Sequence, residues 1–372
     1  MEKDERSRKT IVFFVSKEST LAGGDHPESV LILDDKLIRS ALERAGYSVE
    51  VKLWDFTAAS SDLFSNRLCL VRSVWNWVEC YVEFREFLER AIDISPALPL
   101  VGDFQGVKLC SYKKYLPQFG DLLTDDGDAV IPIVPTVFVE KKKGASLKRI
   151  KMIASAKGWR EVVLKPAVGG RGDGVERIDF RREVPADVAD YFDAQLEVAD
   201  YLLQPFLPDV MRLGEKCLVF IGGTFAHAIR KVPDGWRDEA TTQGRKPKDV
   251  APAGILNVDA EESEAGDHPV EVFTPDDHLM TIAEKVLAQI PDGPPLFARV
   301  DFLPLSDTQW VFSEFEVSWP DLFLRACPKS ADLIPGAIDT FLQRAGHGEP
   351  PPKKQKIWAS ASISSSVLNF CQ

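Results

Sequence analysis

The sequence lacks the marks of an exported, membrane-spanning or disulfide-rich protein. Its longest apolar run, Ile11 to Val15, is far shorter than the roughly 20 residues that a membrane helix requires. It is also shorter than the apolar run of roughly 7–15 residues in a secretory signal. The six cysteines are scattered and form no C-x-x-C pair. We therefore expect a soluble, cytoplasmic protein whose cysteines are reduced and mostly buried.

A surplus of basic residues is also absent. The 57 Asp and Glu residues outnumber the 45 Lys and Arg residues, and the formal net charge is −12. General affinity for the phosphate backbone of nucleic acids requires a basic surface, so we expect no nucleic-acid partner. An acidic total still allows a local cationic site for one anionic ligand.

A length of 372 residues, of which 45% are hydrophobic, is enough for two or three structural units. In the first third, apolar strands alternate with helical periodicity, which is typical of a doubly wound α/β unit. The strands expected there are 11–16, 48–54, 68–72 and 98–102. Later segments favour an α+β arrangement, so the predicted fold class is α/β plus α+β.

We divide the chain into four parts. The α/β unit is expected at 1–130, a small α+β unit at 131–203 and a larger α+β unit at 204–345. Segment 346–372 is rich in Pro, Lys and Ser and is predicted to be disordered.

A glycine-rich turn between two expected strands is the first candidate ligand site. It contains Gly169, Gly170, Gly172 and Gly174, and Lys165 lies just before it. Because glycine has no Cβ, the backbone N–H groups of such a turn can approach phosphate oxygens closely. Neither the G-x-x-x-x-G-K-[ST] spacing of a P-loop nor the helix that follows a Rossmann fingerprint is present. A plain glycine-rich hairpin is the alternative.

Four charged residues on two expected strands form the second candidate site. Arg299 and Asp301 lie two residues apart on one strand, and Glu314 and Glu316 lie two residues apart on the next. Because strand side chains alternate, each pair shares a face, and a hairpin would bring three carboxylates beside one arginine. Their mutual repulsion would raise their pKa values unless a cation lies among them, and Mg²⁺ prefers such oxygen ligands. A solvated charged face is the alternative.

An extended segment broken by proline is the third candidate. Such a segment leaves backbone donors and acceptors unpaired, and these can read the edge of an adenine. Its members are Gln204, Pro205, Phe206 and Leu207. Further along the chain, Glu215 and Lys231 bracket an expected hairpin whose turn is Gly222-Gly223.

Taken in order, these segments resemble the ATP-grasp superfamily of carboxylate–amine ligases, which includes glutathione synthetase and D-alanine–D-alanine ligase. The resemblance runs from about Ile11 to about Phe341 and is closest to the branch of O-ureido-serine cyclo-ligases. Arg72-Ser-Val-Trp75 is similar to the Arg-Ser-x-Trp of that branch, although Asn76-Trp77 stands where Asp-Tyr is usual. The resemblance implies an ATP-grasp fold, in which a pre-ATP-grasp α/β domain precedes a small lid and a C-terminal domain that hold ATP between them.

The segment from Cys110 to Leu116 is similar to the superfamily pattern Asn-x-Asp-Lys-x-Tyr-Leu and departs from it at Cys110 and Tyr112. Lys113 would then be the first ATP lysine, with Lys114 as the alternative. The remaining residues implied to bind ATP are Lys165, the four glycines of the turn, Gln204 to Leu207, Glu215 and Lys231. The implied ligands of Mg²⁺ or Mn²⁺ are Asp301, Glu314 and Glu316. Arg299 would stabilise the oxyanion of an acyl phosphate.

The resemblance implies an ATP-dependent ligase that activates a carboxylate as an acyl phosphate and joins it to an amine, in small-molecule or natural-product biosynthesis. A small-molecule kinase and a non-catalytic ATP-binding protein are the alternatives. Arg72 and Arg237 are candidates for holding a substrate carboxylate, against ordinary ion pairs. The expected partners are a small carboxylic acid and an amine, with no nucleic acid or membrane, and a homodimer is one possible assembly.

Overall fold

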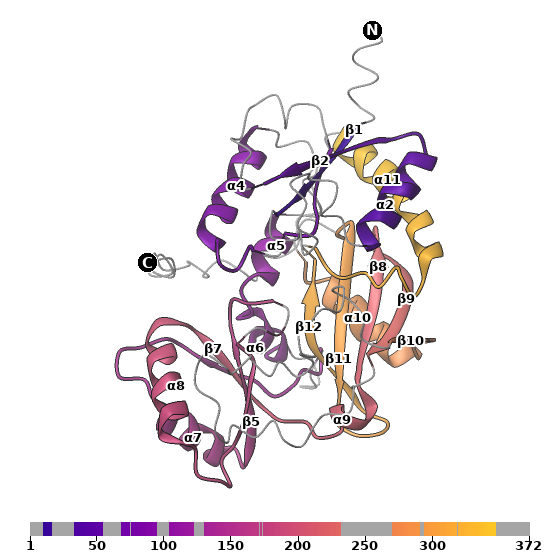
Figure 1. The fold of residues 1–372 in the computed structure, drawn as a ribbon. Coiled ribbons are helices and arrows are strands. Elements are labelled where there is room, and N and C mark those ends of the chain that lie inside the picture. Colours follow the sequence, from indigo (N-terminus) through magenta and orange to yellow (C-terminus); the bar gives the residue numbers. More distant parts are fainter. Residues whose placement is uncertain are drawn as a thin grey trace.

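The computed structural model describes residues 10–16, 33–54, 68–74, 76–94, 104–122, 130–170, 172, 174–231, 270–290, 294–317 and 319–346. Its strands form three sheets, one from each third of the chain (Figure 1). Within the described residues, no helix combines the length and the apolar character needed to cross a membrane.

The first sheet is parallel and has the order β2-β1-β3. Its strands are β1 (Thr10–Val15), β2 (Ser48–Leu53) and β3 (Leu68–Val71), and its helices are α2 (Leu33–Arg44) and α4 (Tyr81–Ile94). Ile11, Phe13 and Val15 pack in one core with residues of α2. Val12 and Phe14 pack in another core with residues of α4. Both faces of the sheet are therefore covered, which confirms the predicted doubly wound unit.

The second sheet is antiparallel and has the order β4-β7-β5-β6. Its strands are β4 (Val137–Val139), β5 (Glu161–Pro166), β6 (Glu176–Asp179) and β7 (Tyr201–Pro205). The helices α7 (Leu147–Ala156) and α8 (Ala186–Val198) contribute to its core, which contains Val162 and Leu164 of β5. Val163 belongs to a separate cluster with Leu303 of the third sheet. The alternation along β5 thus directs Val163 and Lys165 away from the helices.

The third sheet is antiparallel and has the order β10-β9-β8-β11-β12. Its strands are β8 (Glu215–Ile221), β9 (Thr224–Lys231), β10 (Val270–Phe273), β11 (Phe297–Pro304) and β12 (Trp310–Glu316). Helix α10 (Asp277–Leu287) covers one face through Leu279, Ile282 and Val286. The opposite face carries the charged residues described below.

The remaining helices lie between the sheets along the chain or after them. Helices α5 (Phe104–Cys110) and α6 (Tyr115–Gly120) lie between the first and second sheets, and α9 (Val210–Leu213) lies between the second and third. A 3-10 helix (Pro328–Leu333) and α11 (Ile334–Gly346) follow the third sheet. Tyr115 and Phe119 of α6 pack with Phe315 of β12 in the core of the third sheet. Helix α11 packs against α2, so the last described helix returns to the first domain (Figure 1).

Three of the four strands expected in the first third are present, with ends shifted by at most one residue. Gly222 and Gly223 form the predicted hairpin turn, with φ of +60° and +81°. Helix α8 and the edge strands β4 and β10 were not predicted. The last helical segment begins as the 3-10 helix, and α11 starts at Ile334. The expected strand 98–102 lies outside the described residues. Gly346, the first residue of the predicted tail 346–372, ends α11, and the rest of that tail lies outside the described residues. The division into four parts stays a prediction.

Candidate active site

The charged hairpin of β11 and β12 forms as the alternation predicts. Asp301 lies opposite Glu314, and Arg299 lies opposite Glu316, in the antiparallel register. The four side chains therefore share one face of the sheet. Val300, which points to the other face, is buried in the core that α10 covers.

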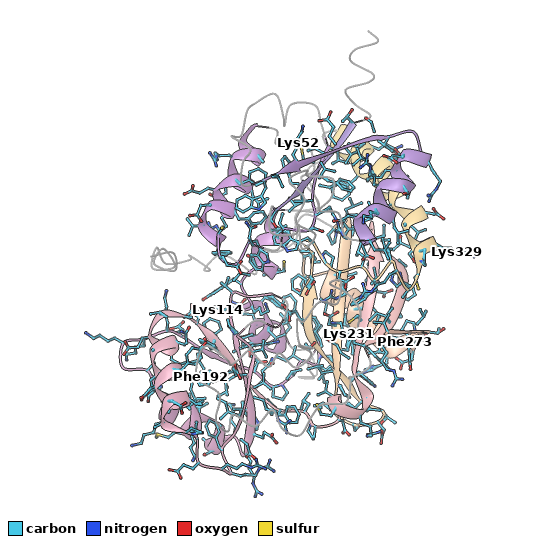
Figure 2. All side chains as sticks on the ribbon, viewed as in Figure 1. Lys52, Lys114, Phe192, Lys231, Phe273 and Lys329 are labelled. Carbon is cyan, nitrogen blue, oxygen red and sulfur yellow. The ribbon has the colours of Figure 1, made fainter. Side chains whose placement is uncertain are left out.

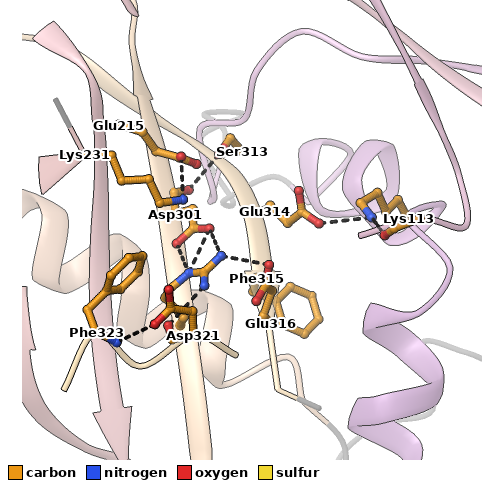
Figure 3. Close-up of polar contacts among 12 residues, drawn as sticks. Lys113, Glu215, Lys231, Asp301, Ser313, Glu314, Phe315, Glu316, Asp321 and Phe323 are labelled. Carbon is orange, nitrogen blue, oxygen red and sulfur yellow. Dashed lines mark hydrogen bonds and ion pairs between the residues drawn. The ribbon is translucent and has the colours of Figure 1, made fainter. Parts of the chain in front are cut away.

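Arg299 is the centre of the hairpin's ion pairs (Figure 3). Its Nε donates to both carboxylate oxygens of Asp301 at 2.9 and 3.1 Å, and Nη2 donates to Glu316 at 2.7 Å. Its Nη1 donates to the backbone carbonyl of Asp321 at 3.1 Å. Burial alone would raise the pKa of Asp301, but Arg299 and Lys231 hold it below its usual value. Burial outweighs the attraction of Arg299 at Glu316 and raises its pKa to about 7.

Glu314 points away from Arg299 and pairs with two lysines. Its Oε1 lies 3.1 Å from Nζ of Lys113, and its Oε2 lies 3.9 Å from Nζ of Lys165. Figure 3 shows Glu314 turned toward Lys113. Burial opposes ionisation of Glu314, but the two lysines hold its pKa below the usual value. Burial lowers the pKa of Lys165. Glu314 thus joins the third sheet to β5 of the second sheet.

Lys113 belongs to this cluster, whereas Lys114 does not. Lys113 is 7% exposed, and its Nζ also donates to the backbone carbonyl of Gly169 in the glycine-rich turn. Lys114 instead pairs with Glu140 at 3.2 Å and lies 4.8 Å from the ring centroid of Phe138, at the edge of the second sheet (Figure 2). The two adjacent lysines therefore face different surroundings.

Glu215 and Lys231 form a second ion pair on the same face. Nζ of Lys231 donates to Glu215 at 2.8 Å. Cys217 lies opposite Asp301 in the register of β8 and β11, and the ligand atoms of Glu215, Cys217 and Asp301 lie within 4.8 Å of one another. Burial raises the pKa of the Cys217 thiol well above its usual value, which favours the protonated thiol. Sequence reasoning missed Cys217 because its position depends on the strand order.

The three predicted metal carboxylates do not gather into one cluster. Among the residues that the structure describes, Glu215, Cys217 and Asp301 are the one group of three whose atoms are close enough to share an ion. Asp301 and Glu316 pair with Arg299, and Glu314 pairs with the lysines. The expected repulsion therefore raises the pKa of Glu316 but not those of Asp301 and Glu314, because cations offset it there.

The glycine-rich turn closes between β5 and β6. Gly172 and Gly174 have φ of +79° and +70°, which a residue with a Cβ rarely adopts. A Cβ at Gly174 would also lie 2.8 Å from Cγ of Pro166. Gly170 lies against the indole of Trp77, since a Cβ there would be 3.6 Å from its Nε1. The turn therefore reaches from the second sheet to the first domain.

The predicted adenine segment begins at the end of β7. The Gln204 side chain donates to Oγ1 of Thr136 at 2.8 Å. The backbone N–H of Phe206 donates to the carbonyl of Glu161 at 3.0 Å, so the expectation that this backbone is unpaired is wrong at Phe206. The guanidinium of Arg177 lies 3.7 Å from the centroid of the Phe206 ring. Arg177, which also pairs with Glu161, is a neighbour of this segment that the sequence did not indicate.

Arg72 is buried in an ion pair. It is 1% exposed, and its Nε donates to Asp35 at 2.8 Å. Its Nη1 has no hydrogen-bond partner among the described residues. The ion-pair alternative for Arg72 is thus realised, and a substrate carboxylate could reach it only after rearrangement. Arg237, the other candidate, lies outside the described residues.

The donor set fits a nucleotide with a divalent cation. A polyphosphate requires several cationic donors, and Mg²⁺ prefers carboxylate oxygens. The cations on or facing the site are Lys113, Lys165, Lys231 and Arg299. The carboxylate of Glu314 between Lys113 and Lys165 demonstrates that an anionic oxygen is accommodated at this position.

Comparison with known proteins identifies relatives of this arrangement. A family model described as the N-terminal domain of D-cycloserine synthetase DcsG matches residues 12–98. The cycloserine biosynthesis protein DcsG of Streptomyces lavendulae is 28% identical over 215 residues, which cover 56% of this chain and 67% of that protein. The crystal structure of D-cycloserine synthetase DcsG is similar with a TM-score of 0.66 at 21% identity, and covers 90% of this chain and 99% of that one.

Two further solved structures share the fold at lower identity. D-alanine–D-alanine ligase from Bacillus anthracis, complexed with ATP, has a TM-score of 0.55 at 14% identity over 92% of this chain and 100% of that one. The ATP-grasp ligase PsnB, complexed with its minimal precursor, Mg and ADP, has a TM-score of 0.53 at 12% identity over 90% and 99%. These likenesses show that the chain has an ATP-grasp fold. The predicted fold class is confirmed. We call the second sheet, with α7 and α8, the lid, after the part of that fold which the sequence leads us to expect there.

Proposed function

We propose that this ATP-grasp protein is an ATP-dependent ligase. It activates a substrate carboxylate as an acyl phosphate, joins the acyl group to an amine, and releases ADP and phosphate. The observation that carries the proposal is Glu314 held between Lys113 and Lys165, because this contact brings the lid and the charged hairpin around one anionic position. The likeness to DcsG and to a D-alanine–D-alanine ligase supports a ligase of small-molecule or natural-product biosynthesis.

The carboxylates of the hairpin are the proposed metal ligands. Asp301, Glu314 and Glu316 would hold Mg²⁺ or Mn²⁺, since hard cations prefer such oxygens. They lie apart in their present ion pairs, so Glu314 would have to leave the two lysines, and Glu316 would have to leave Arg299, when the cation binds. When bound, the metal nucleotide supplies the phosphoryl group and the charge that offsets its transfer. Glu316, with a pKa of about 7, would lose its proton as a cation approaches, because a nearby positive charge favours the carboxylate.

The buried cations would bind the phosphate oxygens. Lys113 and Lys165 already pair with the carboxylate of Glu314. A phosphate oxygen would take the place of this carboxylate as their negative partner. The guanidinium of Arg299 is fixed by Asp301 and by the carbonyl of Asp321. A donor held in this way needs no reorganisation when negative charge develops on the acyl carbon's oxygen.

The glycine-rich turn would exclude water from the acyl phosphate. Lys113 holds the carbonyl of Gly169, and Gly170 packs on Trp77 of the first domain. This closed position shields a reactive intermediate that water would otherwise hydrolyse.

Trapping with hydroxylamine tests the reaction class. The protein is mixed with ATP, Mg²⁺, candidate amino acids and hydroxylamine, and products are measured by mass spectrometry. A hydroxamate formed together with ADP supports the ligase, and a phosphorylated acceptor supports a kinase. AMP with pyrophosphate would contradict both, whereas ATP binding without turnover of any acid would indicate a non-catalytic protein.

We also propose the partners of the protein, its compartment and its assembly. The partners are a small carboxylic acid and an amine, and the dependence on ATP favours the cytoplasm, where ATP is supplied. A homodimer is proposed as the assembly, and the mass of the protein in solution measured by light scattering tests it.

A further inference from the structure

We propose that Ser313 is a positioning residue, which holds a β-bulge that places Glu314 on the charged face of the third sheet. The proposal rests on the proposed function, in which Glu314 is a metal ligand, and it names a residue on which that ligand depends. Ser313 lies next to Glu314 on β12 and is 3% exposed.

Strand β12 has one more residue than the stretch of β11 that it faces. Asp301 lies opposite Glu314, but the next residue of β11, Phe302, lies opposite Phe312. Within these two strands, which are described in full, Ser313 is left without an opposite residue, which is the mark of a β-bulge. An extra residue of this kind reverses the alternation of side chains along the strand that carries it.

The packing of β12 shows this reversal. Phe312 before the bulge and Phe315 after it both pack in the core that α10 covers. They are three residues apart, whereas regular alternation would place core residues at even spacings. Without the bulge, the side chain of residue 314 would point into the core with that of Phe312. The bulge is therefore the reason that Glu314 lies on the charged face and reaches the two lysines.

Two hydrogen bonds hold the backbone on either side of Glu314. Oγ of Ser313 donates to the carbonyl of Asp301 at 3.1 Å, which ties the extra residue to the neighbouring strand (Figure 3). The backbone N–H of Phe315 donates to the hydroxyl of Tyr115 at 3.3 Å. Tyr115 is 1% exposed, and its ring packs on that of Phe315 with centroids 4.5 Å apart. The backbone that carries Glu314 is thus fixed from both sides.

A fixed backbone matters because Glu314 has to change partners. In the proposed function its carboxylate leaves Lys113 and Lys165 when the cation binds. If the backbone is held, this change needs only a rotation of the side chain. Residues that orient a metal ligand in this way typically contribute about 10–100-fold to metal affinity or activity. Loss of the Ser313 hydroxyl should therefore weaken the metal site without removing any of its ligands.

Binding of Mn²⁺ in the presence of ADP tests the role of Ser313 and needs no acid substrate. Bound Mn²⁺ is measured from the electron paramagnetic resonance signal of the free ion. Ser313→Ala should weaken binding about tenfold, and Ser313→Thr, which keeps a hydroxyl, should bind within about threefold of the wild type. In the ADP assay, Ser313→Ala should raise the Mg²⁺ concentration for half-maximal rate about tenfold and lower kcat at saturating Mg²⁺ less than about twofold. A merely structural role would lower kcat and leave the Mg²⁺ requirement unchanged.

Ser330→Ala is the matched control. Ser330 lies in the 3-10 helix, is 8% exposed, and its hydroxyl lies 2.8 Å from Nδ1 of His227. The variant removes a buried hydroxyl outside the hairpin and should leave Mn²⁺ binding unchanged. If Ser313→Ala does not fold, Tyr115→Phe removes the other hydrogen bond beside Glu314 and should weaken Mn²⁺ binding in its place. Unchanged binding in Tyr115→Phe would then overturn the proposal.

The outcomes separate this proposal from the ligase function. Unchanged Mn²⁺ binding in a folded Ser313→Ala, or equal weakening in Ser313→Ala and Ser313→Thr, overturns the role of Ser313 and leaves the ligase standing. Weakened binding that threonine restores supports the role of Ser313, even if no acid gives ADP. A wild-type protein that binds no Mn²⁺ with ADP overturns the proposal, whether or not a hydroxamate forms.

Discussion

Asp34 connects the first domain to the segment that follows the charged hairpin. It lies in the first turn of α2 and is 2% exposed. Its two carboxylate oxygens accept hydrogen bonds from the backbone N–H groups of Leu322 at 3.1 Å and Arg325 at 3.3 Å. Burial, followed by the nearby charge of Asp321, raises the pKa of Asp34 to about 7, against a weaker opposing effect of Arg72. The ionisation of one carboxyl group therefore affects the contact between distant parts of the chain.

The sign of the pH dependence follows from this raised pKa. Between about pH 4 and pH 7 the folded chain retains a proton on Asp34 that the unfolded chain has lost, so stability falls as pH rises. Each unit of pKa difference is worth about 1.4 kcal/mol, and the full loss is about 4 kcal/mol, of which about 2.5 kcal/mol falls between pH 5 and pH 8. The pKa of Asp321 is lowered, since Arg325 overcomes the effect of its burial, so Asp321 titrates below this window.

Asp34→Asn is the variant that isolates the effect. Asparagine keeps an acceptor oxygen of similar shape but does not titrate. We expect the free energy of unfolding of the wild type, relative to Asp34→Asn, to fall by about 2.5 kcal/mol from pH 5 to pH 8 in urea titrations. Glu176 and Glu316 also have pKa values of about 7, but both remain in the variant and cancel. Parallel stability curves for the two proteins would show that Asp34 ionises at its ordinary pKa and refute the reasoning.

Three further predictions concern the active site and the lid. Glu314→Ala should abolish ADP formation, because it removes a proposed metal ligand, and turnover retained in a coupled ADP assay would contradict that role. Lys113→Ala should raise KM for ATP about tenfold or more, whereas Lys114→Ala, whose partner lies outside the cluster, should change it less than about twofold. Equal effects of the two variants would contradict the choice of Lys113 over Lys114 as the ATP lysine. Gly174→Ala should lower the melting temperature more than Gly158→Ala. Both glycines have positive φ, but only a Cβ at Gly174 would lie 2.8 Å from a neighbouring atom. Equal decreases in melting temperature would contradict the role of this clash.

The strands of the active site could be predicted because their pattern is local. Alternation placed Arg299 with Asp301 and Glu314 with Glu316, and β11 and β12 pair in the register that this alternation requires. Helix α8 was missed although Val188, Phe192 and Leu196 recur every fourth residue, because acidic residues between them dilute the apolar signal. The edge strands β4 and β10 are short and partly exposed, so their residues carry little alternation.

The partners of the charged residues could not be predicted, because they come from distant parts of the chain. Glu314 pairs with Lys113, 201 residues earlier in the sequence, and this contact depends on where the tertiary structure places the segment between α5 and α6. Cys217 lies beside Asp301 because β8 and β11 are neighbours, which strand order alone decides. The same is true of Arg177 above Phe206, which joins β6 to the segment after β7. A sequence pattern identifies the charged face, but the pairing of its charges is a property of the tertiary structure.

The pairing explains how an acidic chain can hold a site for a polyanion. Burying a cation without a counter-charge is costly, and each buried cation of the site has a carboxylate partner. Four cations, Lys113, Lys165, Lys231 and Arg299, face four carboxyl groups, Glu215, Asp301, Glu314 and Glu316. Burial raises the pKa values of Glu215 and Glu316 and lowers the pKa of Lys165, and these shifts act in opposite directions on the net charge of the set. The cation of a metal nucleotide can pair with the carboxyl groups, and its phosphates can pair with the lysines and Arg299. A net charge of −12 is therefore compatible with nucleotide binding.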